Sequence, residues 1–339
     1  MQWKLPTLRT VIPVSRRWRD RLSTPKRVAL LYRSLRLVKC EFDIAGEAGG
    51  RCHRCVYLGE GLSLGYYRRI YRSAAPSDSV SVPLWDLRRE IARARERCPV
   101  TMVEINQLLE WLLPAGGAFT DPWIRQETDL ASDSYRRRMR GIEHNFGNRV
   151  RKFNFECRIS RDARDVEQFY AEYCVPHLAA RYGKRAVPSR GVRQLQKVVR
   201  SSGFLLQVWW GERWVSGMVV ERPTAERAVP LAIGLHPSCL ETWQNGALAA
   251  SYYYLFRWAR DNGVHVIGLG GSRPHAKDGL FYHKTLWAAA PERDRWHHTQ
   301  IMFYVDPAAN LPPVVTEQLV WERDRFVSLA EAVVKAQGS

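Results

Sequence analysis

Residues 263–287 read GVHVIGLGGSRPHAKDGLFYHKTLW, and this stretch decides the fold class. Its first part, residues 264–269, is a short apolar run of the kind that forms a buried strand. A glycine-rich loop follows. Residues 280–287 then predict a short helix, in which Leu280 and Trp287 can pack against a sheet. A strand that leads through a loop into a helix is a unit from which α/β domains are built.

The segments around this stretch predict more strands of the same kind. Residues 204–210 (FLLQVWW) and 214–220 (WVSGMVV) flank a Gly-Glu-Arg turn and predict a β-hairpin. Residues 228–235 predict a third strand, residues 247–260 a helix, and residues 300–305 a final strand. This order of strands and helices is typical of an α/β layout in which crossovers bury both faces of the sheet.

The first half of the chain also mixes strands and helices. Its length of 339 residues suits about two domains, and 45% hydrophobic residues suit a globular protein. Ser132 and Asp133 are candidate N-caps for one of its helices. Strands are expected at residues 37–44, 54–58, 100–105, 123–130 and 153–159, and helices at residues 83–97, 106–113, 133–142 and 166–177.

The positive charge is the clearest signal in the composition. The net charge is +18, and residues 1–40 alone hold eleven Lys/Arg against one acid, Asp20. Dense basic runs attract polyanions such as tRNA, an anionic membrane surface or a nucleotide-linked substrate, although a solvated face is the alternative. A second run supplies the candidate polyanion-binding residues: Arg136, Arg137, Arg138, Arg140, Arg149, Arg151 and Lys152.

The sequence predicts a cytoplasmic protein. No stretch reaches the roughly 18 apolar residues that span a bilayer, and arginines interrupt any secretory signal at the N-terminus. Residues 28–38 (VALLYRSLRLV) mix leucines and arginines, which leaves a membrane-surface contact open.

The cysteines do not predict a metal site. Seven cysteines with irregular spacing suit a reducing compartment. Cys52 and Cys55 form a lone CxxC, and the sequence has no second pair of ligands to complete a zinc site. We therefore expect no metal.

The order and spacing of these elements resemble the second half of a GNAT acyltransferase, and in pattern the Fem-type aminoacyltransferases and related exopolysaccharide and natural-product acyltransferases. One stretch that carries the resemblance is residues 123–184, a strand followed by LASDSYRRRMRGIEHNFGNRVRK, a further strand and the helix VEQFYAEYCVPHLAARYGK. The other is residues 263–287, where the family has a strand, a loop and an Asp-Gly-Leu, Lys, Trp pattern. The matching residues here are Asp278, Gly279, Leu280, Lys284 and Trp287.

The resemblance spans roughly residues 100–305 and has departures. Ala288 stands where the family usually has Gly, and His283 where Phe is usual. It implies tandem GNAT-like (Fem-like) α/β domains with mixed sheets flanked by helices. The expected divisions are a basic lead-in at 1–27, a first domain at 28–150, a second domain with the active site at 151–310, and a C-terminal helical segment at 311–339.

The implied reaction joins an acyl group to an amine, which requires alignment, a route for the amine proton and stabilisation of an oxyanion. The resemblance gives Lys284 the role of a cation near the reacting carbonyl or a phosphate. Asp278 is expected to orient Lys284 or take the amine proton, and Tyr282 is a third catalytic candidate. A solvated lysine and an Asp-Gly helix start are the simpler alternatives. The candidate substrate-binding residues are Arg273, Ser272, His283, Lys184 and Gly246.

The donor is predicted from residues 242–248 (TWQNGAL). CoA-dependent GNAT enzymes hold the CoA diphosphate with an Arg/Gln-x-x-Gly-x-Gly/Ala turn at a helix N-terminus. Here only Gly246 and Ala247 remain, and Gln244 is one residue too close to the glycine. This favours aminoacyl-tRNA as co-substrate, with no bound cofactor, over acyl-CoA. The expected acceptor is an amine of a peptide, a cell-wall precursor or a small molecule. A non-catalytic RNA- or membrane-binding protein is the third alternative.

Overall fold

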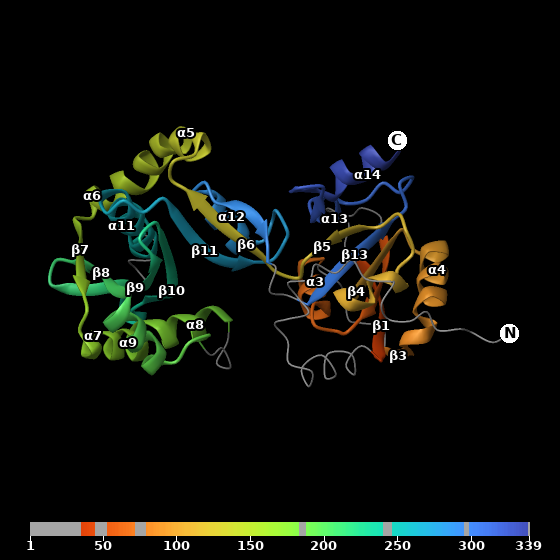
Figure 1. The fold of residues 1–339 in the computed structure, drawn as a ribbon, viewed down its shortest axis with the longest axis horizontal. Helices are drawn as coiled ribbons and strands as arrows, with labels where there is room; N and C mark the ends of the chain where they lie inside the picture. Colours follow the sequence, from red (N-terminus) through yellow and green to blue (C-terminus); the bar gives the residue numbers. More distant parts are fainter. Residues whose placement is uncertain are drawn as a thin grey trace. The chain divides into compact units, whose positions relative to one another are not determined.

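The computed structural model describes residues 35–44, 53–71, 79–182, 188–239, 246–294 and 298–337, which form two compact units (Figure 1). The first unit combines the described parts of residues 1–124 with residues 272–281 and 292–339. The second unit combines residues 125–271 with residues 282–291. The expected lead-in at residues 1–27 lies outside the described residues.

The first unit is built on an eight-stranded mixed sheet with the order β15-β14-β5-β13-β4-β2-β1-β3. Strands β2 and β4 run parallel, whereas β13 runs antiparallel to β4 and to β5. The strands are β1 (Arg36–Ile44), β2 (His53–Gly59), β3 (Val80–Pro83), β4 (Val100–Asn106), β5 (Ala118–Thr120), β13 (Thr299–Val305), β14 (Leu319–Glu322) and β15 (Arg325–Ser328).

Helical segments cover both faces of this sheet. They are α3 (Leu64–Ile70), η1 (Leu84–Asp86), α4 (Leu87–Arg97), η2 (Gln107–Leu112), α13 (Pro313–Thr316) and α14 (Leu329–Gln337). Every residue of β4 is buried, because alternate side chains enter two different cores. Met102 packs with Tyr57 and Tyr67 on one face, and Val103 packs with Leu58 on the other.

The second unit contains a seven-stranded mixed sheet with the order β12-β6-β11-β10-β9-β8-β7. Its strands are β6 (Ile124–Asp129), β7 (Phe155–Ser160), β8 (Gly203–Trp210), β9 (Arg213–Thr224), β10 (Arg227–Leu235), β11 (Val266–Ser272) and β12 (Ala290–Arg293). Its helical segments are α5 (Asp133–Ile142), the π-helix η3 (Glu143–Gly147), α6 (Asn148–Lys152), α7 (Ala163–Gln168), the π-helix η4 (Phe169–Cys174), α8 (Val175–Tyr182), α9 (Val192–Ser201), η5 (Pro237–Cys239), α11 (Ala247–Asp261) and α12 (Gly279–Thr285).

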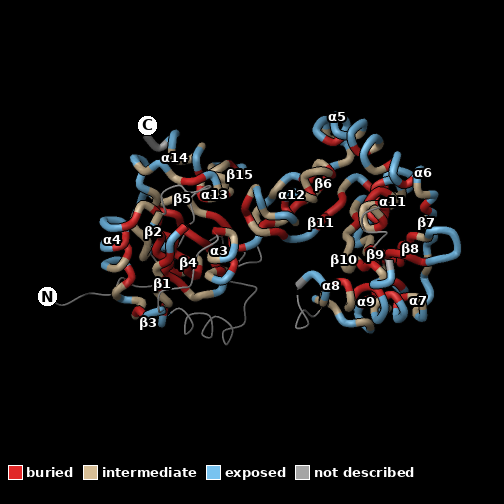
Figure 2. The backbone as a smooth tube through the Cα atoms, turned by 180° about the vertical axis from the view of Figure 1, so that it is seen from behind, coloured by how far each residue is buried: buried red, intermediate tan, exposed pale blue. Residues whose placement is uncertain are grey.

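Two cores enclose the second sheet. Helix α11 contributes Leu255 and Phe256 to one core, and η4 and α9 contribute Phe169 and Leu195 to the other. Buried backbone is concentrated in the strands of each unit (Figure 2). The expected α/β class, with mixed sheets flanked by helices, is therefore confirmed.

The structure divides the chain differently from the expected boundary after residue 150. Residues 125–150 belong to the second unit, and the chain returns to the first unit twice after residue 271. The strand expected at residues 300–305 exists as β13, but it pairs with β4 and not with the second sheet. The expectation of a helical segment at residues 311–339 is wrong in part, because β14 and β15 form a hairpin there.

Local predictions differ in accuracy. Ser132 caps α5 as predicted, because its hydroxyl accepts a hydrogen bond from the Tyr135 amide. The helix expected at residues 106–113 is the 3₁₀ helix η2. Helices α3 and α9 were not predicted.

Candidate active site

The second sheet is interrupted at its centre. Strands β10 and β11 are parallel neighbours, yet their ladder consists of only two pairs, Arg227↔Val266 and Ala228↔Ile267. Beyond this point, residues 229–233 of β10 are half-buried although they lie in the middle of the sheet. The two strands therefore have backbone N–H and C=O groups that are not paired with each other, and such groups need another partner.

Strand β10 is also irregular on its other side. Its register against β9 shifts between Pro230 and Ala232, which leaves Leu231 without a partner in the ladder. Proline has no N–H, so Pro230 cannot donate to a ladder. Extra residues of this kind bend a strand and are over-represented next to active sites.

An ion pair crosses the paired end of β10 and β11. The Arg227 guanidinium on β10 donates to both carboxylate oxygens of Glu127 on β6, with Nη1 2.8 Å from Oε2. Strand β11 lies between these strands, and a Cβ at Gly268 would lie 3.0 Å from Arg227 Nη2. A glycine at this position therefore leaves room for the ion pair.

Lys284 holds the far end of β11. Its side chain is 2% exposed, and its Nζ donates to the Gly270 carbonyl at 3.0 Å and to the Gly271 carbonyl at 2.6 Å. Gly270 has a φ of +75°, in the left-handed region that glycine adopts readily. Lys284 is therefore not the solvated lysine that the sequence left as an alternative, because its ammonium is buried and donates to two backbone carbonyls.

Asp278 begins helix α12. Its Oδ1 accepts the amides of Leu280 at 3.1 Å and Phe281 at 3.0 Å, which is the Asp-Gly helix start that the sequence left as an alternative. Tyr282 on the same helix is 60% exposed. A catalytic role for either residue stays a prediction.

His283 is a half-buried imidazole in the second unit. Its ring meets the edge of Tyr252, with centroids 5.0 Å apart. Its Nε2 is buried and has no hydrogen-bond partner among the described residues. Burial lowers the pKa of His283 below its usual range, and the charges of Arg181 and Lys284 lower it further. The lowered pKa keeps the imidazole neutral, because burial and the two cations disfavour its protonated form.

Trp287 lies one helical turn after His283 and stacks on the same Tyr252 ring at 5.7 Å. Its Nε1 is likewise buried without a partner among the residues described. Two orphaned ring nitrogens beside one tyrosine need an explanation in a native structure.

Gly246 precedes helix α11. It adopts a left-handed conformation with φ of +89°, and a Cβ there would lie 3.6 Å from Cδ of the exposed Arg149. The N-terminus of a helix attracts anions through its free amides and its dipole. Arg149 adds a positive charge at this end of α11.

The other candidate substrate residues lie elsewhere. Arg273 belongs to the first unit, and Ser272 is fully buried as the last residue of β11. Lys184 lies outside the described residues. The structure thus places His283 and Gly246 in the second unit and Arg273 in the first.

The basic run on the second unit follows one continuous helical segment, α5, η3 and α6. All seven candidate residues are exposed. Arg136 pairs with Asp133, and Arg151 pairs with Glu143. Within the described chain, no ion pair is found for Arg137, Arg138, Arg140 or Arg149.

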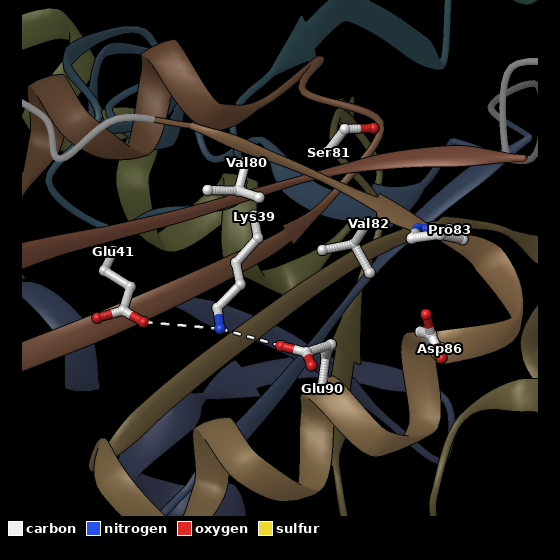
Figure 3. A pocket seen from close by; sticks show the side chains of 8 residues that line it. All are labelled: Lys39, Glu41, Val80, Ser81, Val82, Pro83, Asp86 and Glu90. Carbon is white, nitrogen blue, oxygen red and sulfur yellow. Dashed lines mark hydrogen bonds and ion pairs between the residues drawn. The ribbon is translucent and has the colours of Figure 1, made fainter.

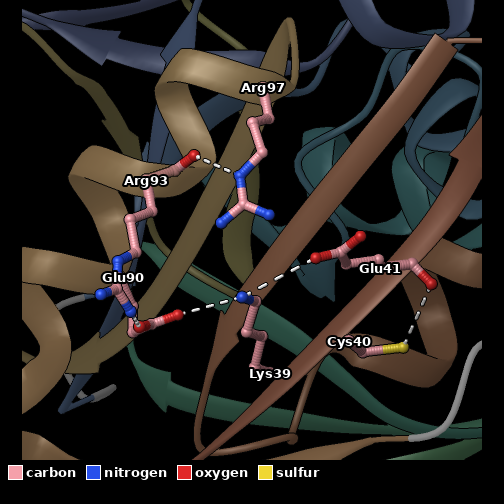
Figure 4. Close-up of polar contacts among 6 residues, drawn as sticks. All are labelled: Lys39, Cys40, Glu41, Glu90, Arg93 and Arg97. Carbon is pink, nitrogen blue, oxygen red and sulfur yellow. Dashed lines mark hydrogen bonds and ion pairs between the residues drawn. The ribbon is translucent and has the colours of Figure 1, made fainter.

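A pocket of about 410 Å³ lies in the first unit, between β1, β3 and α4 (Figure 3). Its central cation, Lys39, contacts Glu90 at 3.0 Å and Glu41 at 3.7 Å. Glu90 also accepts from Arg93 at 2.8 Å (Figure 4). These charges neutralise one another, and the pocket contains none of the candidate residues.

Two further findings concern metals and membranes. The described residues contain no cluster of His, Cys, Asp and Glu that could hold a metal ion, and Cys52 lies outside them. Within the same residues, no helix has the length and apolar character to cross a membrane.

Neither a protein-family model nor a curated protein sequence matches this chain. Among solved structures, the chain is similar to L-PGS from Bacillus licheniformis over 85% of this chain and 93% of that chain, at 10% identity and a TM-score of 0.39. It is similar to FemX over 80% and 88%, at 10% identity and a TM-score of 0.40. A GCN5-related N-acetyltransferase from Kribbella flavida matches over 84% and 94%, at 11% identity and a TM-score of 0.30. Likenesses this weak leave the activity to be argued from the residues of this chain.

Several contributors to the site were not predicted from the sequence. Glu127, Arg227, Leu231 and Tyr252 carry no motif. A signal existed only for Pro230, because a proline inside a predicted strand indicates an irregularity.

Proposed function

We propose that this chain is an acyltransferase that transfers an aminoacyl group from aminoacyl-tRNA to an amine and so forms an amide bond. The observation that carries the proposal is the divergence of β10 and β11 after two residue pairs, next to the unpaired Leu231. An extended acyl donor can hydrogen-bond to strands that do not pair with each other. The Leu231 N–H is our candidate donor to the carbonyl oxygen as it becomes an oxyanion.

The proton route in this proposal runs through His283. The amine nitrogen attacks the ester carbon, the ester bond to the tRNA ribose breaks, and the ribose oxygen leaves with a proton. The proton lost by the amine goes to a neutral base, and the buried Nε2 of His283 is such an acceptor. Lys284 is a positioning residue here, because it fixes the backbone at the end of β11.

Phosphates of the donor are proposed to contact the helical segment α5–α6 and the N-terminus of α11. Arg137, Arg138 and Arg140 are exposed and lack ion pairs with described residues, and Arg149 lies beside Gly246. Counterion release makes such binding strongly salt-dependent. The helix terminus would also suit the diphosphate of acyl-CoA, which keeps an acyl-CoA-dependent N-acyltransferase as the second candidate.

Charge substitutions test the tRNA contact. Arg137, Arg138 and Arg140 are replaced together by Gln, and tRNA affinity is measured at several salt concentrations. We expect weaker binding and a salt slope reduced by about 2, since each phosphate contact contributes about 0.7–0.9.

The matched control replaces Arg164, Arg193 and Arg200 by Gln. These arginines are also exposed and in the second unit, but they lie on α7 and α9. The control variant should retain most of the affinity. Equal losses in both variants would mean that tRNA responds only to net charge and that α5 is not its contact.

A further inference from the structure

The first unit contains an arginine held between two aromatic rings. The Arg273 guanidinium carbon lies 4.2 Å from the Trp123 ring centre and 4.8 Å from the Tyr66 ring centre. Planar guanidinium groups stack favourably on aromatic faces, which fixes their orientation. Arg273 is half-buried, and its direction is therefore set before any ligand arrives.

Within the described residues, only the Nη1 nitrogen of this guanidinium forms hydrogen bonds. Its Nη1 donates to the Pro122 carbonyl at 2.9 Å and to the Ser63 hydroxyl at 3.4 Å. Among the residues that the structure describes, Nε and Nη2 have no acceptor, and Arg273 has no ion pair. Arginine stays protonated in proteins, so the N–H groups of Nε and Nη2 can donate hydrogen bonds to a ligand.

The hydroxyl of Tyr66 is a second group without a partner. Its Oη is buried and makes no hydrogen bond within the described residues, although the same ring lies against Arg273. A buried hydroxyl without a hydrogen-bond partner is unfavourable. An acceptor at this place would serve the hydroxyl and the guanidinium together.

The surroundings of Tyr66 are rigid. Glu104 on β4 accepts hydrogen bonds from the Ser63 amide at 3.2 Å and the Ser63 hydroxyl at 2.6 Å, and also from the Tyr57 hydroxyl. Ser63 is the residue from which α3 starts, so Glu104 holds the helix that carries Tyr66. This network orients the group formed by Arg273, Trp123 and Tyr66, which we call the clamp.

Two carboxylates, Glu104 and Asp278, act electrostatically on Arg273. Burial raises the pKa of Tyr66, and the charge of Asp278 raises it further. Burial lowers the pKa of Arg273, and the charges of Glu104 and Asp278 oppose this shift. Nearby carboxylates favour a ligand group with a single negative charge over a dianion, because like charges repel.

We propose that Arg273 and the Tyr66 hydroxyl bind a singly charged oxyanion of a ligand, either a carboxylate or a phosphodiester. Both groups offer two oxygens to a planar guanidinium, which is the geometry of bidentate binding. The site lies entirely in the first unit and goes beyond the proposed acyl transfer, since binding is measured without turnover.

The test uses fluorine NMR on the full chain labelled with 5-fluorotryptophan. The Trp123 signal is assigned from its loss in Trp123→Phe. N-acetylglycine (a carboxylate) and dimethyl phosphate (a phosphodiester) are titrated at constant ionic strength, with N-acetylglycinamide and trimethyl phosphate as uncharged controls. We expect a saturable shift of the Trp123 signal with at least one anion and none with the uncharged compounds.

Variants decide whether the clamp binds the anion. Arg273→Lys keeps the charge but loses the planar fork, and we expect at least tenfold weaker binding. Tyr66→Phe should weaken binding about fivefold. Arg95→Lys is the matched control, because Arg95 also stacks on a ring of this unit, Tyr304, at 4.9 Å. It should change nothing.

Each outcome is decisive. Saturation by one compound alone identifies the oxyanion, and saturation by both supports the shared chemistry. A shift that does not saturate, or that persists unchanged in Arg273→Lys and Tyr66→Phe, would overturn the proposal and make Arg273 a clamp for the Pro122 backbone only. If Arg273→Lys does not fold, Tyr66→Phe alone gives the answer.

Discussion

Single residues hold the end of β11 in place, and Lys284 is the main one. Replacing Lys284 by Met removes the buried ammonium that donates to the carbonyls of Gly270 and Gly271, two residues that are themselves exposed. We expect the free energy of unfolding to fall by about 1.5–3 kcal/mol, the contribution of a hydrogen bond to a charged group. Turnover should fall about 10²-fold, the cost of a misplacement of about 1 Å, because in the proposed mechanism Lys284 supports the strand beside the reacting carbonyl.

Urea unfolding and single-turnover rates of Lys284→Met separate these effects. The sequence alone predicts lost turnover with folding retained. The buried position of the ammonium adds the loss of stability. Wild-type stability together with near-normal turnover would remove Lys284 from the account.

His275 supplies a test of pH dependence at the residue scale. It is fully buried, its Nε2 lies 2.7 Å from the Val314 carbonyl, and its Nδ1 accepts the Lys277 amide at 3.0 Å. Protonation of Nδ1 would break the second bond. Burial lowers the pKa of His275, although the Val314 carbonyl and nearby acids raise it.

A histidine whose folded pKa is depressed stabilises the protein above its unfolded pKa of about 6.5. This stability is lost as the pH falls through the folded pKa. His177 and His283, whose pKa values burial also lowers, act in the same direction. We expect thermal midpoints to fall between pH 7 and pH 5, and to fall less in His275→Gln. An identical pH dependence in the two proteins would contradict this.

At the scale of elements, β10 is positioned by its contact with the π-helix η4. A Cβ at Gly234 would lie 2.6 Å from the Tyr173 carbonyl carbon and 2.7 Å from the Cys174 nitrogen. These are backbone atoms and cannot move aside. We expect Gly234→Ala to cost about 1–3 kcal/mol, as overpacking does.

Gly141→Ala is the opposite case. Gly141 lies on α5, and a Cβ there would meet nothing within 4 Å. Alanine in a helix is favoured over glycine by about 0.5–1 kcal/mol, so this variant should be stabilised. The denaturant midpoints of both variants test the packing of β10 on η4. An unchanged midpoint in Gly234→Ala would contradict the close contact between β10 and η4.

Elements also show what could be predicted from sequence. Strands β8 and β9 were predicted within a few residues, because apolar runs around a Gly-containing turn are local signals. The pairing of β13 with β4 was not predicted, because it depends on contacts between residues far apart in the chain. Asp278 and Lys284 were found through a motif. Their partners were not, because the directions of the Gly270 and Gly271 carbonyls depend on the fold.

At the scale of the whole molecule, the proposed activity combines the site on the second sheet with a basic surface. The net charge of +18 is a property of composition that sequence alone predicts. Sequence alone does not predict which arginines of α5 are unpaired, because this depends on which acidic side chains lie within reach in the fold. A positive surface of this kind steers polyanions and does not by itself specify chemistry.

Acyl transfer to an amine is tested by following amide formation from both candidate donors. The purified chain is incubated with either radiolabelled aminoacyl-tRNA or acyl-CoA and a mixture of amines, and amide product is followed by chromatography. We predict amide formation from aminoacyl-tRNA that is lost in His283→Ala, a variant whose folding is checked by its thermal midpoint. Amide formation from acyl-CoA alone would contradict the proposed donor, and no amide from either donor, with both bound, would contradict the claim of acyl transfer.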